Sequence, residues 1–189
     1  YFSTFAKSMA SIGAFVAGDM KIIDYIRYNI RSQIFAKSLP MPLVVGNLKR
    51  LDLLRKNPAL KEKLWSNAQK LQKGLKERGF DIGKTDSVVT PVYMTGDVPE
   101  ATAMVMDLRE NYGIFASIVV YPVIPKGHII YRLIPSAIHT DKDIEETLEA
   151  FSATKKKLDA GEYKAEAIPD MAEYSGKRFD YMTDRPKNK

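Results

Sequence analysis

Cysteine is absent from this sequence of 189 residues, and that absence excludes several kinds of site. Without a thiol there is no disulfide, no zinc–thiolate centre and no cysteine nucleophile. A chain without cysteine suits a reducing compartment, and we expect a cytoplasmic protein. Histidine is scarce as well, because His128 and His139 are the only two, and neither has a second histidine or an acidic partner at metal-ligand spacing. The sequence therefore predicts no metal site.

Long hydrophobic runs are also missing. No apolar stretch approaches the ~20 residues that a membrane-spanning helix needs, so we expect no transmembrane segment. The opening "YFSTFAKSMASIG" lacks the basic and then apolar layout of a signal peptide, and it lacks an initiator methionine. Because the pattern opens without a cap or turn at Tyr1 and Phe2, we expect the chain to be the later portion of a longer polypeptide.

Acidic residues are in the minority, with 23 Asp and Glu against 29 Lys and Arg, which gives a formal net charge of +6. A basic balance can attract anionic ligands such as phosphates, coenzyme A or nucleic acid. The lysines are spread over helix-like segments such as "KEK" and "KKK", and no basic stripe alternates with stacking aromatic residues. We therefore expect no nucleic-acid partner.

The first part of the chain predicts a short strand and then a helix. "GAFVAGD" (13–19) is typical of a short buried strand that ends in a helix cap, with Asp19 as the N-cap. The apolar positions that follow share one helical face: Ile22, Ile23, Ile26 and Ile30. We assign 1–45 to the end of a large cofactor-binding domain.

Prolines divide the predicted helical segment that comes next. Pro40 and Pro42 disfavour continuation of the first helix, and Pro58 interrupts a second, longer helical stretch after Asn57. That stretch stops at Gly79. We interpret 46–79 as helices that connect two domains.

From about residue 80 the pattern changes to the order strand, helix, strand, strand, helix. The segments are 87–94, 97–113, 114–122, 128–135 and 140–158. This order predicts a small α+β domain over 80–160, with its helices on one face of a short, mainly antiparallel sheet. An irregular tail is expected over 161–189.

Individual residues support these boundaries. Pro91 favours an edge position for the first of the strands. Asp97 before Pro99 begins the next helix and Gly113 ends it. Thr140, with an acidic residue three positions later, forms a variant of the capping box at the start of the last helix.

Lys7 is unusual because it has no charged residue near it before Asp19. A lysine becomes a useful nucleophile when its amine is desolvated or lies near positive charge, and it then forms a Schiff base with a carbonyl. Thr4 and Ser8 would place hydroxyl groups for a phosphate close to that amine. Thr-x-x-Lys is a common pattern, so the spacing alone leaves both a reactive lysine and an ordinary loop lysine open.

Three separated motifs occur in an informative order: "TFAKSMASIGAFVAGD", "RSQIFAKSLP" and "YPVIPKGHIIYRLIPSAIHT". Together they closely resemble the α-oxoamine synthases, which are α/β enzymes of fold type I that use pyridoxal 5′-phosphate (PLP). The family includes glycine C-acetyltransferase, serine palmitoyltransferase, 8-amino-7-oxononanoate synthase and 5-aminolevulinate synthase. The resemblance runs from Tyr1 to about Leu158, so it implies the C-terminal part of this fold.

The resemblance also assigns residues to the cofactor. It implies that Lys7 forms the internal aldimine with PLP and later moves the α-proton of the substrate. It implies that Thr4 hydrogen-bonds the PLP phosphate, and that Ser38 supplies a hydroxyl to the phosphate bound by the neighbouring subunit. Ala36 stands where the family commonly has Ser or Thr, and for this reason we place that hydroxyl on Ser38.

For the substrate, the resemblance implies that Arg132 binds the carboxylate of the amino acid, a task that suits the fork of a guanidinium. Read without the resemblance, a lone arginine in a strand is more often a surface or ion-paired residue. Lys126 in "IPKG" is within the motif and could reach an anionic group of coenzyme A, although a solvated turn lysine is the simpler interpretation.

The implied reaction condenses glycine or serine with an acyl-CoA, with loss of carbon dioxide, in a homodimer whose active site lies at the subunit interface. Such activity belongs to amino acid metabolism or sphingolipid biosynthesis. The family's pyridine-binding aspartate, ring-stacking histidine and glycine-rich phosphate turn precede the lysine, so we expect these 189 residues alone to be inactive and free of cofactor. The alternatives are a fold-type I aminotransferase and a non-catalytic dimerisation or binding module.

Overall fold

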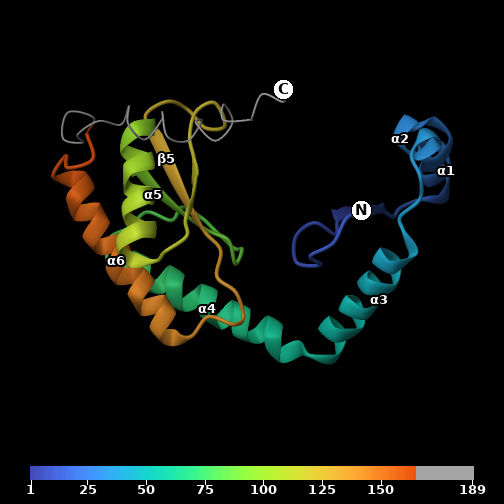
Figure 1. Cartoon of the computed structure of the whole chain (residues 1–189), viewed down its shortest axis with the longest axis horizontal. Coiled ribbons are helices and arrows are strands. Elements are labelled where there is room, and N and C mark those ends of the chain that lie inside the picture. Colours follow the sequence, from blue (N-terminus) through green and yellow to red (C-terminus); the bar gives the residue numbers. More distant parts are fainter. Residues whose placement is uncertain (165–189) are drawn as a thin grey trace, which may run out of the picture. The chain divides into compact units, whose positions relative to one another are not determined.

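The structure is a computed structural model that describes residues 1–164, and the chain divides into two compact units (Figure 1). The first unit is Tyr1–Lys61 and the second begins at Glu62. This division falls inside the stretch 46–79, and the assignment of segments to the domains of a complete enzyme stays a prediction. Most of the tail predicted over 161–189 lies outside the described residues.

The first unit opens with a two-stranded antiparallel hairpin. Strand β1 (Phe2–Thr4) pairs with β2 (Ala14–Val16), with Thr4 opposite Ala14. The strand predicted within 13–19 is present, but it is not buried as predicted, because Phe15 is 42% and Val16 43% exposed. Two strands alone have no second layer to pack against, so their apolar side chains keep contact with solvent.

Three helices follow the hairpin: α1 (Met20–Asn29), α2 (Arg31–Phe35) and α3 (Met41–Lys56). The Asp19 carboxylate accepts a hydrogen bond from the N–H of Lys21 at 2.9 Å, which confirms the predicted N-cap. The two prolines do separate α2 from α3. Pro42, however, lies in the first turn of α3, where an N–H has no helical partner to lose.

Helix α4 (Pro58–Glu77) begins in the first unit and continues into the second. Pro58 starts it directly after Asn57, so the predicted interruption is confirmed.

Within residues 1–164, no helix combines the length and the apolar composition that crossing a membrane requires.

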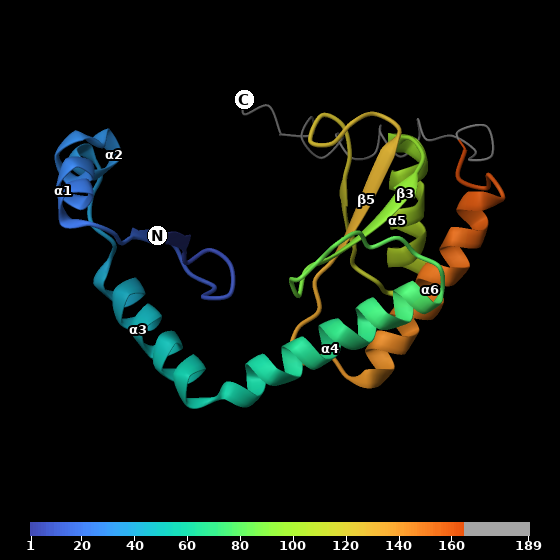
Figure 2. The ribbon, with the colours of Figure 1, turned by 180° about the vertical axis from the view of Figure 1, so that it is seen from behind.

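The second unit contains a three-stranded antiparallel sheet in the order β3–β5–β4. Its elements are β3 (Thr90–Thr95), α5 (Val98–Tyr112), β4 (Ser117–Val119), β5 (His128–Leu133) and α6 (Asp141–Asp159). Figure 2 shows β3 beside the central strand β5. The predicted order of elements is therefore confirmed, and so is the edge position that Pro91 indicated for β3.

Burial alternates along β5 and defines the two faces of the sheet. Ile129, Tyr131 and Leu133 are buried in one core with apolar residues of α4, α5 and α6. The Tyr131 ring meets the Phe151 ring of α6 edge to face, with centroids 6.0 Å apart. The opposite face carries His128 and Arg132, which are exposed. The helices thus pack on one face of the sheet, as predicted.

Local capping fixes where α5 and α6 begin. Asp97 and Glu100 form a reciprocal capping box at the start of α5, and Thr140 and Asp143 form another at the start of α6. Gly113 ends α5 with a φ of 68°, in the left-handed region that favours glycine. Each of these predicted boundaries is confirmed.

Candidate active site

Lys7 lies in the loop that joins β1 to β2. The Lys7 carbonyl accepts a hydrogen bond from the Ala10 N–H at 2.8 Å, and Phe5 closes the base of the loop through bonds with Gly13 and Ser11, each of 2.9 Å. The Lys7 side chain is exposed, and its amine has no hydrogen bond or ion pair with the described residues. The loop therefore holds the backbone of Lys7 and leaves its amine available.

Gly13 brings a second predicted segment to this loop. Its φ is 108°, and a Cβ added there would lie 2.8 Å from the methyl carbons of Leu39. A side chain at this position would therefore be strained and would collide with Leu39. Because Leu39 directly follows Ser38, this close approach packs the Ser38 segment against the end of the Lys7 loop.

The donors around the loop suit the chemistry of PLP. Thr4 ends β1, and its hydroxyl, like that of Ser38, forms no hydrogen bond with the described residues. Sequence reasoning missed Ser11, whose buried hydroxyl also lacks a partner among them. An amine can condense with an aldehyde and hydroxyl groups can donate to a phosphate, so the donor set of the first unit fits the cofactor.

Arg132 belongs to the second unit, at the end of β5. It lies between Pro91 on β3 and Ser117 on β4, on the exposed face of the sheet. The Arg132 Nε donates a hydrogen bond to the Ser117 hydroxyl at 3.1 Å. No carboxylate pairs with Arg132 among residues 1–164, so the ion-paired alternative has no support within that part of the chain.

Sequence reasoning did not identify Ser117. The signal that would have found it is the strand register, because Ser117 and Arg132 become neighbours only when β4 and β5 pair. That pairing depends on the order of the strands in the sheet, which cannot be read from a single sequence.

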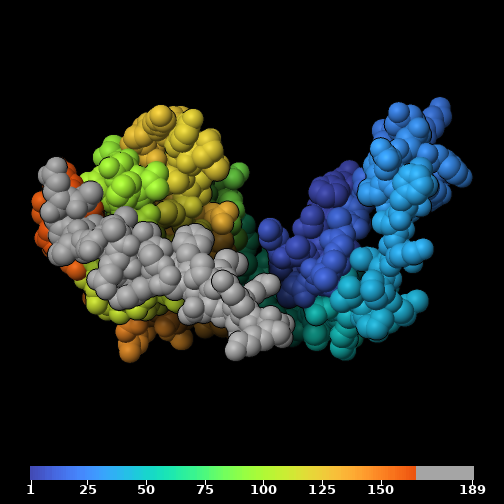
Figure 3. Space-filling view, turned by 45° about the horizontal axis from the view of Figure 1, so that its top comes forward, coloured from blue at the N-terminus to red at the C-terminus, as the bar shows by residue number. Residues whose placement is uncertain are grey.

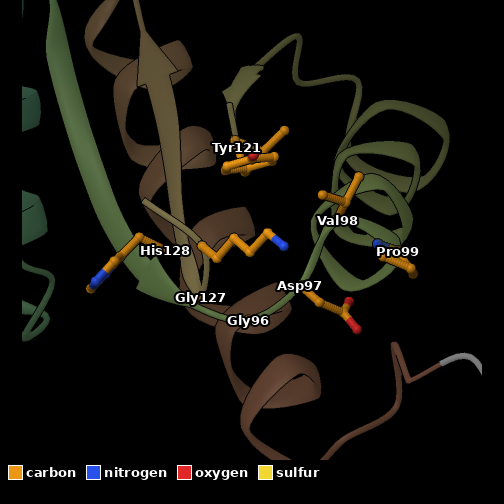
Figure 4. Close-up of a pocket in the computed structure, with 9 residues that line it drawn as sticks. Gly96, Asp97, Val98, Pro99, Tyr121, Gly127 and His128 are labelled. Carbon is orange, nitrogen blue, oxygen red and sulfur yellow. The ribbon is translucent and has the colours of Figure 1, made fainter. Parts of the chain in front are cut away.

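A surface pocket of about 320 Å³ lies between the N-terminal end of α5 and the loop from β4 to β5. Figure 3 shows α5 and this loop side by side on the surface of the second unit. The Lys126 amine lines the pocket, 5.0 Å from the centroid of the Tyr121 ring. In Figure 4 the His128 imidazole points away from Tyr121 and Val98. Contact of Lys126 with coenzyme A stays a prediction.

Metal ligands do not gather in the described part of the molecule. Across residues 1–164, no three His, Cys, Asp or Glu side chains come together in a way that could hold an ion. His139 has a structural contact, because its Nδ1 accepts a hydrogen bond from the Ser136 N–H at 3.2 Å.

Comparison with known proteins places these features in a family. A model of the family "aminotransferase class I and II" matches residues 1–151, which is most of the chain. The chain belongs to the class I and II aminotransferase family. The family model includes Lys7, Thr4, Ser38 and Arg132 in its matched range.

Its relatives in this family include acyltransferases. The chain is 64% identical over 165 residues to the cysteate-C-fatty acyltransferase of Capnocytophaga ochracea. It is 37% identical over 146 residues to a serine palmitoyltransferase of Sphingobacterium spiritivorum, and 34% over 155 residues to an 8-amino-7-oxononanoate synthase of Thermoanaerobacter pseudethanolicus. These alignments cover 87%, 77% and 82% of this chain but only 39%, 36% and 39% of the relatives.

Solved structures agree with the family. A serine palmitoyltransferase (SPT) with a PLP internal aldimine matches with a TM-score of 0.75 and 30% identity, over 83% of this chain and 39% of that one. The serine palmitoyltransferase of Sphingomonas wittichii matches with a TM-score of 0.74 and 25% identity, over 84% of this chain and 40% of that one. The predicted resemblance, the fold-type I architecture and the PLP-dependent family are confirmed.

Proposed function

We propose that this chain is part of a PLP-dependent acyltransferase that joins a fatty acyl group to the α-carbon of an amino acid. The observation that carries the proposal is the 64% identity with a cysteate-C-fatty acyltransferase over 165 residues. Because the identity with a serine palmitoyltransferase is 37%, cysteate is the first candidate substrate and serine the second. The sequence motifs alone had favoured glycine or serine.

The proposed reaction exchanges one carbon–carbon bond for another. A bond forms between the α-carbon of the amino acid and the carbonyl carbon of an acyl thioester, such as an acyl-CoA. The thiolate leaves and is protonated to the free thiol, and the amino-acid carboxylate leaves as carbon dioxide. A proton removed from the α-carbon at the start is replaced after the carboxylate has gone, which gives an aminoketone.

Four residues of the chain have proposed tasks in this reaction. When bound, PLP supplies an electron sink for the negative charge that develops at the α-carbon. Lys7 holds the cofactor through its Nζ, and its freed amine then moves the α-proton as base and acid. The Thr4 and Ser38 hydroxyls donate to the phosphate. Arg132 binds the substrate carboxylate, which fixes the orientation of the bonds at the α-carbon.

The proposed enzyme is a homodimer with its active site at the interface. The support is the first unit, where large apolar side chains stay exposed, among them Tyr25, Tyr28, Phe35 and Met41. Exposed apolar surface of this extent is typical of an interface. Ser38 would then serve the phosphate of the partner subunit.

The test uses the full-length polypeptide that contains this chain, loaded with PLP. Release of free thiol is measured with cysteate, serine and glycine, each against palmitoyl-CoA and acetyl-CoA. We expect the highest rate with cysteate and palmitoyl-CoA. Lys7→Ala should lower that rate at least about 10³-fold, because it removes the group that moves the proton. The matched control is Lys21→Ala, which removes another exposed lysine without an ion pair among the described residues.

Each result has a distinct meaning. Preference for serine would favour a serine palmitoyltransferase activity and overturn the cysteate assignment. Absence of thiol release with every pair, together with amino-group transfer to a keto acid, would move the protein to the aminotransferases. Equal rates for Lys7→Ala and the wild type would remove Lys7 from the active site.

A further inference from the structure

We infer that Ser117 is a positioning residue that orients the Arg132 guanidinium so that both of its terminal Nη atoms face the substrate carboxylate. This inference rests on the proposed function, because it assumes that Arg132 binds the amino acid. It adds to that function a second residue, on a different strand, and a defined mode of binding.

Strand register places the two side chains together. Ser117 of β4 lies directly opposite Arg132 of β5, and side chains at directly opposed positions project from the same face of a sheet. Both residues are exposed on the face away from the core. The contact is therefore a consequence of how the two strands pair and does not depend on a flexible loop.

Two hydrogen bonds define the arrangement. The Arg132 Nε–H donates to the Ser117 Oγ at 3.1 Å. The Ser117 hydroxyl in turn lies 3.5 Å from the Arg132 carbonyl oxygen, to which it can donate its proton. With its proton on that side, the hydroxyl offers a lone pair to Nε. The serine thus contacts both the main chain and the side chain of Arg132.

The other neighbours of Arg132 offer it no competing partner. Pro91 lies opposite it on β3, and a proline side chain has no hydrogen-bonding group. Among residues 1–164, Ser117 is the only side chain that hydrogen-bonds the Arg132 guanidinium. A surface arginine with no carboxylate beside it keeps its charge available for an anionic ligand.

The engaged atom decides how the arginine can bind. A guanidinium meets a carboxylate either side-on, through Nε and one Nη, or end-on, through both Nη atoms. Ser117 occupies Nε–H and so removes the side-on mode. The end-on mode remains, with two parallel N–H donors for the two carboxylate oxygens. By fixing one edge of the guanidinium, Ser117 also reduces the rotamer freedom that Arg132 would lose on binding.

The test measures amino-acid binding to the PLP-loaded, full-length enzyme through the change in cofactor absorbance. Cysteate is titrated first, and serine if it proves the better substrate. We expect Ser117→Ala to raise the amino-acid Kd roughly five- to tenfold, with little change in the KM for the acyl thioester. Ser117→Thr keeps the hydroxyl and should restore the wild-type Kd. Val119→Ala is the matched control, because Val119 lies on the same strand and makes no such bond.

An amine without a carboxylate gives a second readout. Ethanolamine lacks the carboxylate that Arg132 is proposed to bind, so its Kd should be the same for the wild type and for Ser117→Ala. In an Arg132→Ala background, Ser117→Ala should have no further effect on the amino-acid Kd. A purely structural loss would weaken binding of both kinds of amine.

The outcomes separate this inference from the proposed function. If Arg132→Lys weakens amino-acid binding but Ser117→Ala does not, Ser117 has no positioning task and only the present inference is overturned. If neither substitution changes amino-acid binding, the task proposed for Arg132 is itself wrong. An equal loss of affinity for serine and ethanolamine in Ser117→Ala would also overturn the inference.

Discussion

At the scale of single residues, the Asp107 carboxylate on α5 is bound by three other side chains of the second unit. Its carboxylate accepts hydrogen bonds from Lys157 at 2.7 Å, from Asn111 at 2.6 Å and from the Tyr163 hydroxyl. The Asp107 side chain is only 9% exposed. Burial acts to raise the pKa of Asp107, but the hydrogen bonds from Lys157, Tyr163 and Asn111 outweigh it and lower that pKa from its usual 3.8.

The direction of this shift predicts how stability depends on pH. Because its pKa is lower in the folded chain than in the unfolded chain, Asp107 contributes stability above pH 3.8, and that contribution is lost as the pH falls through the folded-state value. We expect Asp107→Asn to cost about 1–3 kcal/mol at pH 7 and to flatten the acid limb of the stability profile. Urea unfolding of the chain, followed through Trp65 between about pH 3 and pH 7, measures both effects.

The control for this prediction is Asp86→Asn. Asp86 is an exposed carboxylate without a hydrogen bond to the described residues, so its substitution should leave the acid limb unchanged. An acid limb equally steep in Asp107→Asn and in the wild type would show that Asp107 is not the group responsible.

At the scale of elements, α4 holds the segment that follows β5. Asn67 is 0% exposed, and its amide Nδ2 donates to the carbonyls of Ser136 and His139, each at 2.9 Å. These two carbonyls lie in the connection from the Arg132 strand to α6. One buried side chain of α4 therefore fixes the path of the chain between two elements.

Removing that side chain predicts a loss of stability. Asn67→Leu keeps a similar volume but leaves two partly buried carbonyls without their donor, and we expect it to cost about 2–4 kcal/mol. Gln72→Leu is the comparison, since the Gln72 amide lies in a half-buried position on the same helix, and its loss should cost less. Urea unfolding followed through Trp65 measures both, and equal costs would contradict the importance assigned to burial.

Elements with local signals could be predicted from the sequence, whereas those that depend on distant partners could not. The caps at Asp19, Asp97 and Thr140 involve residues within one turn of each other, and each is found where the sequence placed it. In contrast, the strand predicted over 114–122 is reduced to Ser117–Val119, because only those residues pair with β5. The predicted burial of β2 was wrong for the same reason, because burying a strand requires a second layer that packs against it.

The candidate site divides in the same way. Lys7, Thr4, Ser38 and Arg132 were predicted through motifs, and all four side chains are exposed in the structure. Ser117 was missed, because only the pairing of β4 with β5 brings its hydroxyl to Arg132. Sequence motifs can therefore predict which residues form a site, but the contacts that support those residues depend on the strand register.

At the scale of the whole molecule, the two units differ in how they bury apolar residues. Among residues 1–164, all of the fully buried apolar side chains belong to the second unit, and all of them except Ala68 form one cluster, which includes Leu75, Tyr131 and Phe151. In Tyr1–Lys61 the only buried residue is Asn47, and neither polar atom of its side chain has a partner among the described residues. The second unit therefore has a core of its own and the first has none.

This difference predicts that the second unit folds alone and that the first does not. A polypeptide of Glu62–Lys189 should unfold in urea in one cooperative transition, because its cluster of buried residues is intact. A polypeptide of Tyr1–Lys61 should show no cooperative transition, because burial of apolar surface is the main source of folding free energy and this unit buries too little of it. Phe151→Ala serves as the control in Glu62–Lys189: it should cost about 3–5 kcal/mol, which confirms that the transition reports the core. A cooperative transition in Tyr1–Lys61 would mean that its hairpin and helices are stable without a partner surface, and it would remove the support that their exposed apolar residues give to a dimer.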